Sequence, residues 1–203
     1  VTMVRSFSII KTGSNKHSQL CLTLCLAEMV DYTKQFARMG TTELSLDERN
    51  ILSVAFKNIV GTRRAAWRVL SSIQKKENNK QNTDNVAKVK NYKAKIEKEM
   101  TDICQEILDL LTEFLIPNAQ AGEGKVFFYK MKADYNRYIA EYTQGDKKQQ
   151  AAQKASLAYT DAMNVAKETL SPTHPVKLGL SLNHSVFFYE IMQNPEKACT
   201  MAR

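Results

Sequence analysis

The sequence predicts an all-α protein. Only 7 glycines and 4 prolines occur among 203 residues, too few for the many tight turns that an all-β chain of this length needs. Apolar residues instead recur at helical spacing, and Ser45 stands three residues before Glu48 in the pattern of a capping box. Because 43% of the residues are hydrophobic, the chain can bury one sizeable core, and we expect residues 1–203 to form a single domain.

The N-terminal region, residues 1–43, has the weakest pattern. The first 18 residues show neither a clear period nor strong turn chemistry, so we expect them to be irregular. The following stretch "LCLTLCLAEMVDYTKQFARM" is typical of a helix because its apolar residues have helical spacing: Leu22, Cys25, Met29, Tyr32 and Phe36.

Two long helices are predicted next. The first starts near Leu46, continues through Ile73 and ends at the polar "KKENNKQNTDN", which indicates a connecting loop. Its core-facing residues are Phe56, Ile59, Val60, Trp67 and Leu70. The second runs from about Val86 to Leu115 and ends before Pro117, with a predicted buried stripe of Tyr92, Ile96, Ile103, Ile107, Leu110, Leu111 and Phe114.

Three further helices and a short last segment complete the chain. Their expected ranges are 125–142, 147–170 and 176–193, separated by Gly145 and by the pair Pro172 and Pro175. No apolar run approaches the roughly 20 residues of a membrane span, and the N-terminal "VTMVRSFSII" lacks the pattern of a signal peptide. We therefore expect a cytoplasmic protein that does not bind membranes, with a nuclear location left open.

The chain offers no chemistry of an enzyme. Cys21, Cys25, Cys104 and Cys199 are scattered without a CxxC pair or a nearby histidine, which favours free buried thiols over disulfides or a zinc site. No pairing of a nucleophile with a base and no glycine-rich phosphate loop appears. We therefore expect no catalytic residues, no metal and no cofactor.

The net charge is +8, which permits binding to nucleic acid, an anionic membrane or phosphorylated proteins. Much of the excess lies between Lys75 and Lys98, where eight lysines face only Glu77, Asp84 and Glu97. Because Tyr92 is the single aromatic residue among these lysines, a solvated helix face is favoured over a nucleic-acid surface.

A cationic stripe marks the first long helix. At 100° per residue, Lys57, Gly61, Arg64 and Arg68 share one band, whereas Arg63 points about 100° away and is expected at the surface or in an ion pair. Cations held this close repel one another, so an anion nearby would stabilise them. A phosphate is suitable because the planar arginine side chain matches its oxygens in pairs. Gly61, which has no side chain, would let the phosphate approach the backbone. Pairing with acids of a neighbouring helix, or plain exposure at the surface, is the alternative.

Two later helices carry complementary patterns. In "KMKADYNRY", Lys130, Asp134 and Arg137 form a second band, with Tyr138 beside it as a hydroxyl donor and Asp134 spaced to orient a basic side chain. Further on, Leu178, Leu182 and Val186 recur every four residues, with Asn183 and Glu190 near the same edge. An aliphatic wall beside an amide suits an extended peptide, although a core stripe with a satisfied amide remains the alternative.

Four stretches together resemble the 14-3-3 family: "LSLDERNILSVAFKNIVGTRRAAWRVLSSI", "YKAKIEKEMTDICQEILDLLTEFLIPNA", "KVFFYKMKADYNRYIAEY" and "SPTHPVKLGLSLNHSVFFYEIMQNPEKAC". They cover most of residues 44–199 in the family's order. The resemblance implies an antiparallel array of helices with a concave groove, in which a usually dimeric adaptor holds phosphoserine or phosphothreonine peptides.

The resemblance also implies roles for single residues. It assigns the phosphate to Lys57, Arg64, Arg137 and Tyr138, with Lys130 and Asp134 lining or ordering the site. It assigns the peptide main chain to Asn183 and Glu190 and the apolar wall to Leu182 and Val186. Tyr92, Lys95 and Glu99 match family positions that face a partner subunit, which implies a homodimer.

Three departures from the family pattern affect these expectations. The region 1–43 matches only approximately, at "LAEMVDYTKQFARM", although the family's first helices form much of the dimer interface. The chain is basic, whereas family members are generally acidic. The sequence ends at Arg203, before the further helix that completes the groove in family members with an asparagine and a tryptophan.

Two other functions remain as alternatives. The chain can be a degenerate structural or assembly module that keeps the helical scaffold and binds partners independently of phosphate, through its lysine-rich surface. Nucleic-acid binding through the lysine-rich surface is the less favoured reading and predicts a steep fall of affinity with salt.

Overall fold

The computed structural model describes residues 28–35, 37–38 and 43–202. The expected irregular segment 1–18, the thiols Cys21 and Cys25, and the positions Leu22 and Phe36 lie outside these residues. Residues 28–35 and 37–38 are helical, as predicted, and Met29 packs half-buried against the core. Tyr32 was wrongly included in the apolar face because it is 64% exposed, whereas Val30 and Ala37 are buried.

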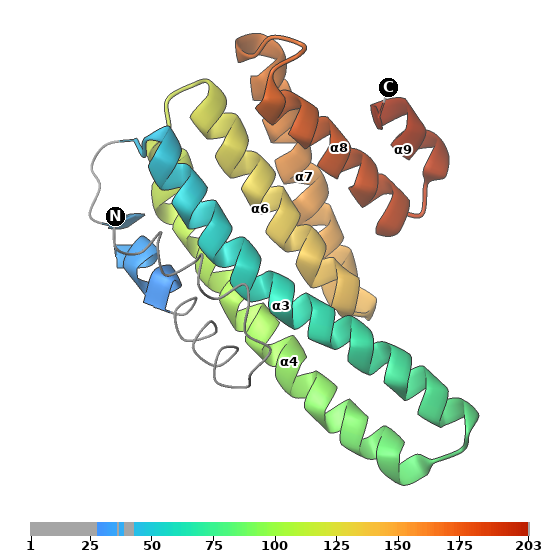
Figure 1. Ribbon diagram of the computed structural model, residues 1–203. Helices are drawn as coiled ribbons and strands as arrows, with labels where there is room; N and C mark the ends of the chain where they lie inside the picture. The colour runs from blue at the N-terminus through green and yellow to red at the C-terminus, as the bar shows by residue number, and fades with distance from the viewer. Residues whose placement is uncertain (1–27, 36, 39–42, 203) are drawn as a thin grey trace, which may run out of the picture.

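Two helical hairpins make up most of the fold (Figure 1). Helices α3 (Leu46–Asn79) and α4 (Thr83–Leu110) form a long hairpin whose tip projects beyond the other helices. Helices α6 (Glu123–Tyr142) and α7 (Gly145–Thr169) form the second hairpin, followed by α8 (Pro175–Glu190) and α9 (Pro195–Ala202). All regular structure in the described residues is helical, which confirms the predicted fold class.

Helix α3 begins as predicted and ends later. The Ser45 hydroxyl accepts a hydrogen bond from the Glu48 backbone N–H, and the Glu48 carboxylate accepts one from the Ser45 N–H, so the capping box is present. The predicted loop "KKENNKQNTDN" was wrong, because α3 continues to Asn79 and the turn is confined to residues 80–82. The segment has no glycine or proline to end the helix, and the chain reverses where Gln81 takes a φ of 59°.

The end of the second long helix also differs from the prediction. Helix α4 passes into a π-helical segment, η2 (Leu111–Leu115), and then into the short helix α5 (Ile116–Asn118), which contains Pro117. Proline fits there because the first turn of a helix needs no donor from its backbone nitrogen. Tyr92, predicted in the buried stripe, is 56% exposed and was wrongly placed there.

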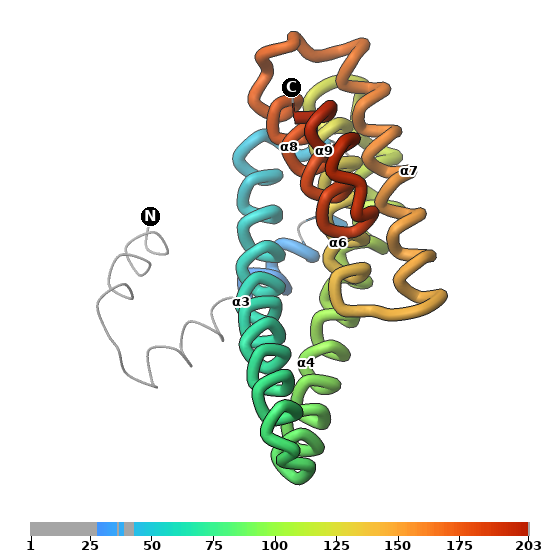
Figure 2. The backbone as a smooth tube through the Cα atoms, turned by 90° about the vertical axis from the view of Figure 1, so that its right-hand side faces the viewer, coloured from blue at the N-terminus to red at the C-terminus, as the bar shows by residue number. Residues whose placement is uncertain are grey.

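The later helices lie within about three residues of their predicted ranges. Gly145 has a φ of 57°, a left-handed conformation that favours glycine, and it turns the chain from α6 into α7. Helix α7 packs closely on α6 because one of its faces is a row of small buried residues: Ala151, Ala155, Ala158, Ala162 and Ala166. Figure 2 shows α7 running beside α6 over most of its length.

The core continues through both hairpins. Phe56 and Val60 of α3 are buried, as predicted, whereas Trp67 and Leu70 are half-buried and pack against Ile96, Met100 and Tyr142. Of the two thiols in the described part of the chain, Cys104 is buried and free as expected, but Cys199 is exposed and corrects the prediction. Among the described helices, none is long and apolar enough to cross a membrane.

His184 of α8 is a buried polar residue without a polar partner. Its ring stacks between Tyr159 and Phe188, with both ring centroids at 4.8 Å, and neither ring nitrogen has a hydrogen-bond partner in the described residues. Burial, with a smaller contribution from the charge of Lys197, lowers the pKa of His184 to about 4. The imidazole is therefore neutral in the folded protein at pH 7.

We expect this histidine to make the protein less stable in mild acid. The unfolded chain takes up the proton below about pH 6.5, but the folded chain takes it up only near pH 4. The free energy of unfolding therefore falls across this window, by about 1–2 kcal/mol from this group. His184→Phe should remove that part of the pH dependence, measured by urea unfolding at several pH values. Equal slopes in both proteins would contradict the assignment.

Candidate functional site

Helix α3 presents the cationic stripe along one edge. Lys57 and Arg68 are exposed and Arg64 is half-buried, so the stripe borders the core residues of the same helix. A Cβ added at Gly61 would meet no heavy atom within 4 Å, which leaves open space between the cations. Arg63, expected at the surface or in a pair, donates from Nε to Glu99 over 2.8 Å.

Helix α6 supplies the second set of charges from a more enclosed position. It packs against α3, α4, α7 and α8, so it has little solvent-exposed surface left for its polar residues. Asp134 and Arg137 are each only 6% exposed. Charged groups buried to this degree must be paired to offset their lost hydration.

Asp134 is the centre of this pairing. Its carboxylate accepts hydrogen bonds from Lys130 Nζ at 2.9 Å and from the Tyr159 hydroxyl at 2.5 Å. The Asn183 amide donates to both carboxylate oxygens, at 2.8 and 2.9 Å, and the Arg137 guanidinium lies 3.5 Å away. Asp134 thus holds side chains from α6, α7 and α8 in one network, and its acceptor sites are occupied within the chain.

Glu141 links the two cationic bands. It accepts from Arg64 Nε at 3.0 Å and from Arg64 Nη2 at 2.5 Å, a two-pronged pair between α3 and α6. Arg137 Nη1 lies 3.4 Å from the same carboxylate and Arg68 Nη2 lies 3.6 Å from it. The alternative of internal pairing therefore describes part of the stripe, because both of its arginines, Arg64 and Arg68, share Glu141 with Arg137 of α6.

Tyr138 lies beneath the two arginines. The Arg64 guanidinium carbon lies 4.0 Å from the ring centroid and that of Arg137 lies 4.7 Å from it. These cation–π contacts hold both guanidinium groups against the ring. Burial first, and then the nearby Asp134 charge, raise the pKa of Tyr138, so the phenol keeps its proton and can act as a donor.

Arg137 stays charged although it is buried. Burial alone would lower its pKa, but Tyr159, Asp134 and Tyr138 outweigh that effect and raise it. Burial also raises the pKa of Tyr159, with Asp134 adding to the shift, so this tyrosine remains a neutral donor. The network therefore holds a permanent cation in a fixed orientation.

A small pocket of about 110 Å³ opens beside this network. Residues from α3, α6 and α8 form it: Ser53, Lys57, Phe127, Lys130, Met131, Asp134, Tyr135, Tyr138 and Asn183. Lys57 makes no ion pair among the described residues, unlike the arginines. An ammonium group without an ion pair in the described residues therefore lines a pocket that Lys130 and Tyr138 also line.

Helix α8 adds an apolar edge. Leu178 and Leu182 are 55% and 60% exposed, and Val186 is half-buried. These positions are therefore not a core stripe, the alternative that their spacing alone left open. Glu190 is exposed and its carboxylate lies 3.8 Å from Arg137 Nη1.

Comparison with known proteins points to one family. The family model described as 14-3-3 protein matches residues 22–203. A 14-3-3-like protein D from Nicotiana tabacum is 49% identical over 177 residues, 87% of this chain and 71% of that protein. 14-3-3 protein 2 from Entamoeba histolytica is 52% identical over 176 residues, 87% of this chain and 73% of that protein.

The 14-3-3 protein epsilon from Drosophila melanogaster is 49% identical over 176 residues, which are 87% of this chain and 67% of that protein. The chain belongs to the 14-3-3 family. Members of the 14-3-3 family are non-enzymatic adaptors that bind partner proteins and typically form homodimers. The 14-3-3 match begins at residue 22 and so includes part of the region that looked divergent.

In this 14-3-3 chain, the residues that the resemblance assigned to a partner subunit lie on α4. Tyr92 is 56% exposed and Lys95 is exposed, so both are accessible. Glu99 is exposed as well, but it already pairs with Arg63. Within the described residues, no cluster of histidine, cysteine or acidic side chains could hold a metal ion.

Sequence reasoning missed two members of the hydrogen-bonded network at the candidate site. Glu141 stands four residues after Arg137 on the same helix, a spacing that places the two side chains on one face and could have indicated their pairing. Tyr159 lies on α7 and donates to Asp134, 25 residues away in sequence. No local pattern marks that tyrosine as different from a core residue.

Proposed function

We propose that this protein is a phosphoserine- or phosphothreonine-peptide-binding adaptor. The observation that supports this proposal most strongly is the cluster of cations around Tyr138. Arg64 and Arg137 stack on the Tyr138 ring, and Lys57 and Lys130 line the adjacent pocket. The phosphate brings a charge of about −1.5 to −2 at neutral pH and accepts several charge-assisted hydrogen bonds. Lys57, Arg64, Arg137 and Tyr138 are its proposed ligands.

The internal acids support this role instead of opposing it. Glu141 and Asp134 hold the guanidinium groups in place, and arginine has five N–H donors, so unused donors remain for the phosphate. Cations outnumber carboxylates around the pocket: Lys57, Arg64, Arg68, Lys130 and Arg137 face Asp134, Glu141 and Glu190. A preorganised site of this kind binds an anion without first ordering its own side chains.

The peptide itself is proposed to lie along α8. Its apolar side chains would contact Leu182 and Val186, both of which leave surface exposed. The Asn183 amide group donates to Asp134, so its carbonyl oxygen is the atom left to accept from the peptide main chain. Glu190 lies next to this path, on the same helix.

A homodimer is part of the proposal. Tyr92 offers exposed aromatic surface on α4, and Lys95 lies one turn further along the same helix. Large exposed aromatic side chains are enriched in protein interfaces. Two linked sites would raise the affinity for doubly phosphorylated partners through effective concentration.

The proposed function is tested by titrating the protein with three fluorescent probes: a phosphoserine peptide, its unmodified twin and a single-stranded oligonucleotide. Three or four charge-assisted hydrogen bonds, less the cost of ordering the peptide, predict a Kd in roughly the micromolar range. We expect at least about 100-fold weaker binding of the unmodified twin. Equal binding of both peptides would overturn the proposal and favour a phosphate-independent assembly module. Preferential binding of the oligonucleotide would favour a nucleic-acid role.

A further inference from the structure

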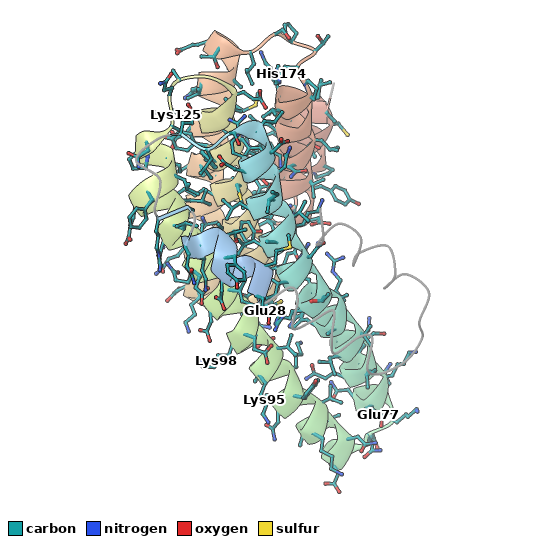
Figure 3. All side chains as sticks on the ribbon, turned by 60° about the vertical axis from the view of Figure 1, so that its left-hand side comes forward. Glu28, Glu77, Lys95, Lys98, Lys125 and His174 are labelled. Carbon is teal, nitrogen blue, oxygen red and sulfur yellow. The ribbon has the colours of Figure 1, made fainter. Side chains whose placement is uncertain are left out.

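A second charged pocket lies away from the proposed peptide site. It has a volume of about 500 Å³ and opens between the outer half of the α3–α4 hairpin and the connection from α6 to α7. Figure 2 shows that connection reaching α4 part-way along the hairpin, and Figure 3 shows Lys98 and Lys95 on this part of α4. The pocket shares no lining residue with the pocket beside Tyr138. We call it the lysine pocket.

The lysine pocket has an excess of positive charge. Four lysines line it, Lys90, Lys93 and Lys98 from α4 and Lys147 from α7, and the single acid of its lining is Glu97. Glu97 accepts a hydrogen bond from the Trp67 indole at 2.7 Å, so part of its acceptor capacity is used.

The lysines differ in their partners. Lys98 pairs with Asp102 at 2.9 Å, and Lys93 donates to Gln74 at 3.3 Å while its ammonium group lies 4.8 Å from the centroid of the Trp67 ring. Lys90 and Lys147 make no ion pair within the described part of the chain. Their charges approach the pocket from two different helices, and an anion between them would relieve their mutual repulsion.

Uncharged donors complete the lining. The amide groups of Gln74 and Gln144 can donate to an anion, whereas the Thr101 and Thr143 hydroxyls already donate to the backbone carbonyls of Glu97 and Ile139. Gln144 is the N-cap of α7 and makes no side-chain cap hydrogen bond, so the first backbone N–H groups of this 25-residue helix lack that partner. The positive end of the helix dipole thus adds to the charge of the lysines at the same place, and Asp146 in the first turn of α7 offsets part of it.

The lining also restricts the kind of anion. Tyr142 is its one aromatic residue, only 8% exposed, and the Tyr142 hydroxyl lies 2.9 Å from that of Thr101. A nucleobase therefore finds no exposed ring on which to stack. A single phosphate, with a charge of about −1.5 to −2, would leave part of the positive charge of the four lysines unbalanced, and a volume of this size accommodates a larger small molecule.

We propose that the lysine pocket binds a small polyanion with several phosphate groups close together, of the inositol polyphosphate class. The ligand would bridge Lys90 and Lys147, with Lys93 and Lys98 and the start of α7 contacting further phosphate oxygens. The same chemistry occurs on free inositol phosphates and on phosphoinositide headgroups. This site is independent of the peptide site, because the two pockets have no residue in common.

Isothermal titration calorimetry with inositol hexakisphosphate tests the proposal. The double variant Lys90→Ala/Lys147→Ala should weaken binding at least about 10-fold, since it removes two charge-assisted contacts. The control Lys76→Ala/Lys88→Ala removes the same charge from exposed lysines outside the lining and should change affinity less than about 2-fold. Lys57→Glu, in the other pocket, should also leave this affinity unchanged.

Three results would overturn the proposal: no binding of the probe, equal weakening by both double variants, or loss of binding in Lys57→Glu. Tighter binding of a single-stranded oligonucleotide than of the probe, weakened by the same Lys90 and Lys147 changes, would also overturn it. Sedimentation with vesicles containing phosphatidylinositol bisphosphate distinguishes a phosphoinositide headgroup from a free inositol phosphate as the ligand. Vesicle binding that the Lys90/Lys147 variant abolishes supports the site with a lipid headgroup, and probe binding without vesicle binding supports it with a soluble ligand.

Discussion

Replacing Lys57 with glutamate should weaken phosphopeptide binding at least about 100-fold, close to 3 kcal/mol, without lowering stability. Lys57 is exposed and has no ion pair among the described residues, so the folded chain loses no contact that holds it together. Yet it lines the pocket beside Tyr138, where the new carboxylate would repel a phosphate. Fluorescence anisotropy with a labelled phosphoserine peptide measures the binding, and urea unfolding measures the stability.

The matched control is Lys76→Glu. Lys76 is also an exposed lysine of α3 without an ion pair in the described residues, but it lies near the hairpin tip and outside the pocket. This variant makes the same change in net charge, so it reports the effect of long-range electrostatics alone. Equal weakening by the two variants, or normal binding in Lys57→Glu, would contradict the assignment of Lys57 to the phosphate.

Replacing Arg137 with leucine should lower the free energy of unfolding by about 3–5 kcal/mol. The guanidinium is nearly fully buried and contacts Asp134, Glu141 and Glu190, so its removal leaves acids near one another with too little positive charge. Urea unfolding followed by circular dichroism at pH 7 measures the loss. The expected loss is large because removing one member of a buried ion pair leaves the other charges without compensation.

Arg68→Leu provides the comparison for Arg137. Arg68 also approaches Glu141, at 3.6 Å, but its side chain is 60% exposed, so its loss should cost less than about 1 kcal/mol. A change of under about 1 kcal/mol in Arg137→Leu would show that the network does not depend on this cation. If the large loss is found, reduced peptide binding by Arg137 variants reflects altered structure as well as a lost ligand. Lys57 is then the sharper test of phosphate recognition.

Local sequence patterns predicted the helices well but not all of their ends. The capping box at Ser45 fixed the start of α3 because both of its hydrogen bonds join residues three apart. The end of α3 was misplaced because polar residues are compatible with an exposed helix, and the segment from Lys75 to Asn79 is helical. Tyr92 was misassigned for a related reason, since helical spacing identifies a face but not which element covers it.

For the candidate site, too, the sequence predicted which residues share a helix face but not which residues of different helices pair. The spacing of Lys57, Arg64 and Arg68 places them on one band of α3, and that of Lys130, Asp134 and Arg137 does so on α6. The resemblance added the expectation that the two bands serve one ligand. Neither source indicated that Arg64 and Arg137 share Glu141, because the hydrogen bond between Arg64 and Glu141 joins residues 77 apart.

By itself, the sequence determined that this protein is helical, where most of its helices begin, and which charged residues share a helix face. These features depend on hydrogen bonds and side-chain spacing within a few residues. Only the tertiary structure decided that Arg137 is buried, that Tyr159 and Asn183 hold Asp134, and that Lys90 and Lys147 face one pocket. The physical reason is that burial and pairing depend on which helices pack together, and the partners come from distant parts of the chain.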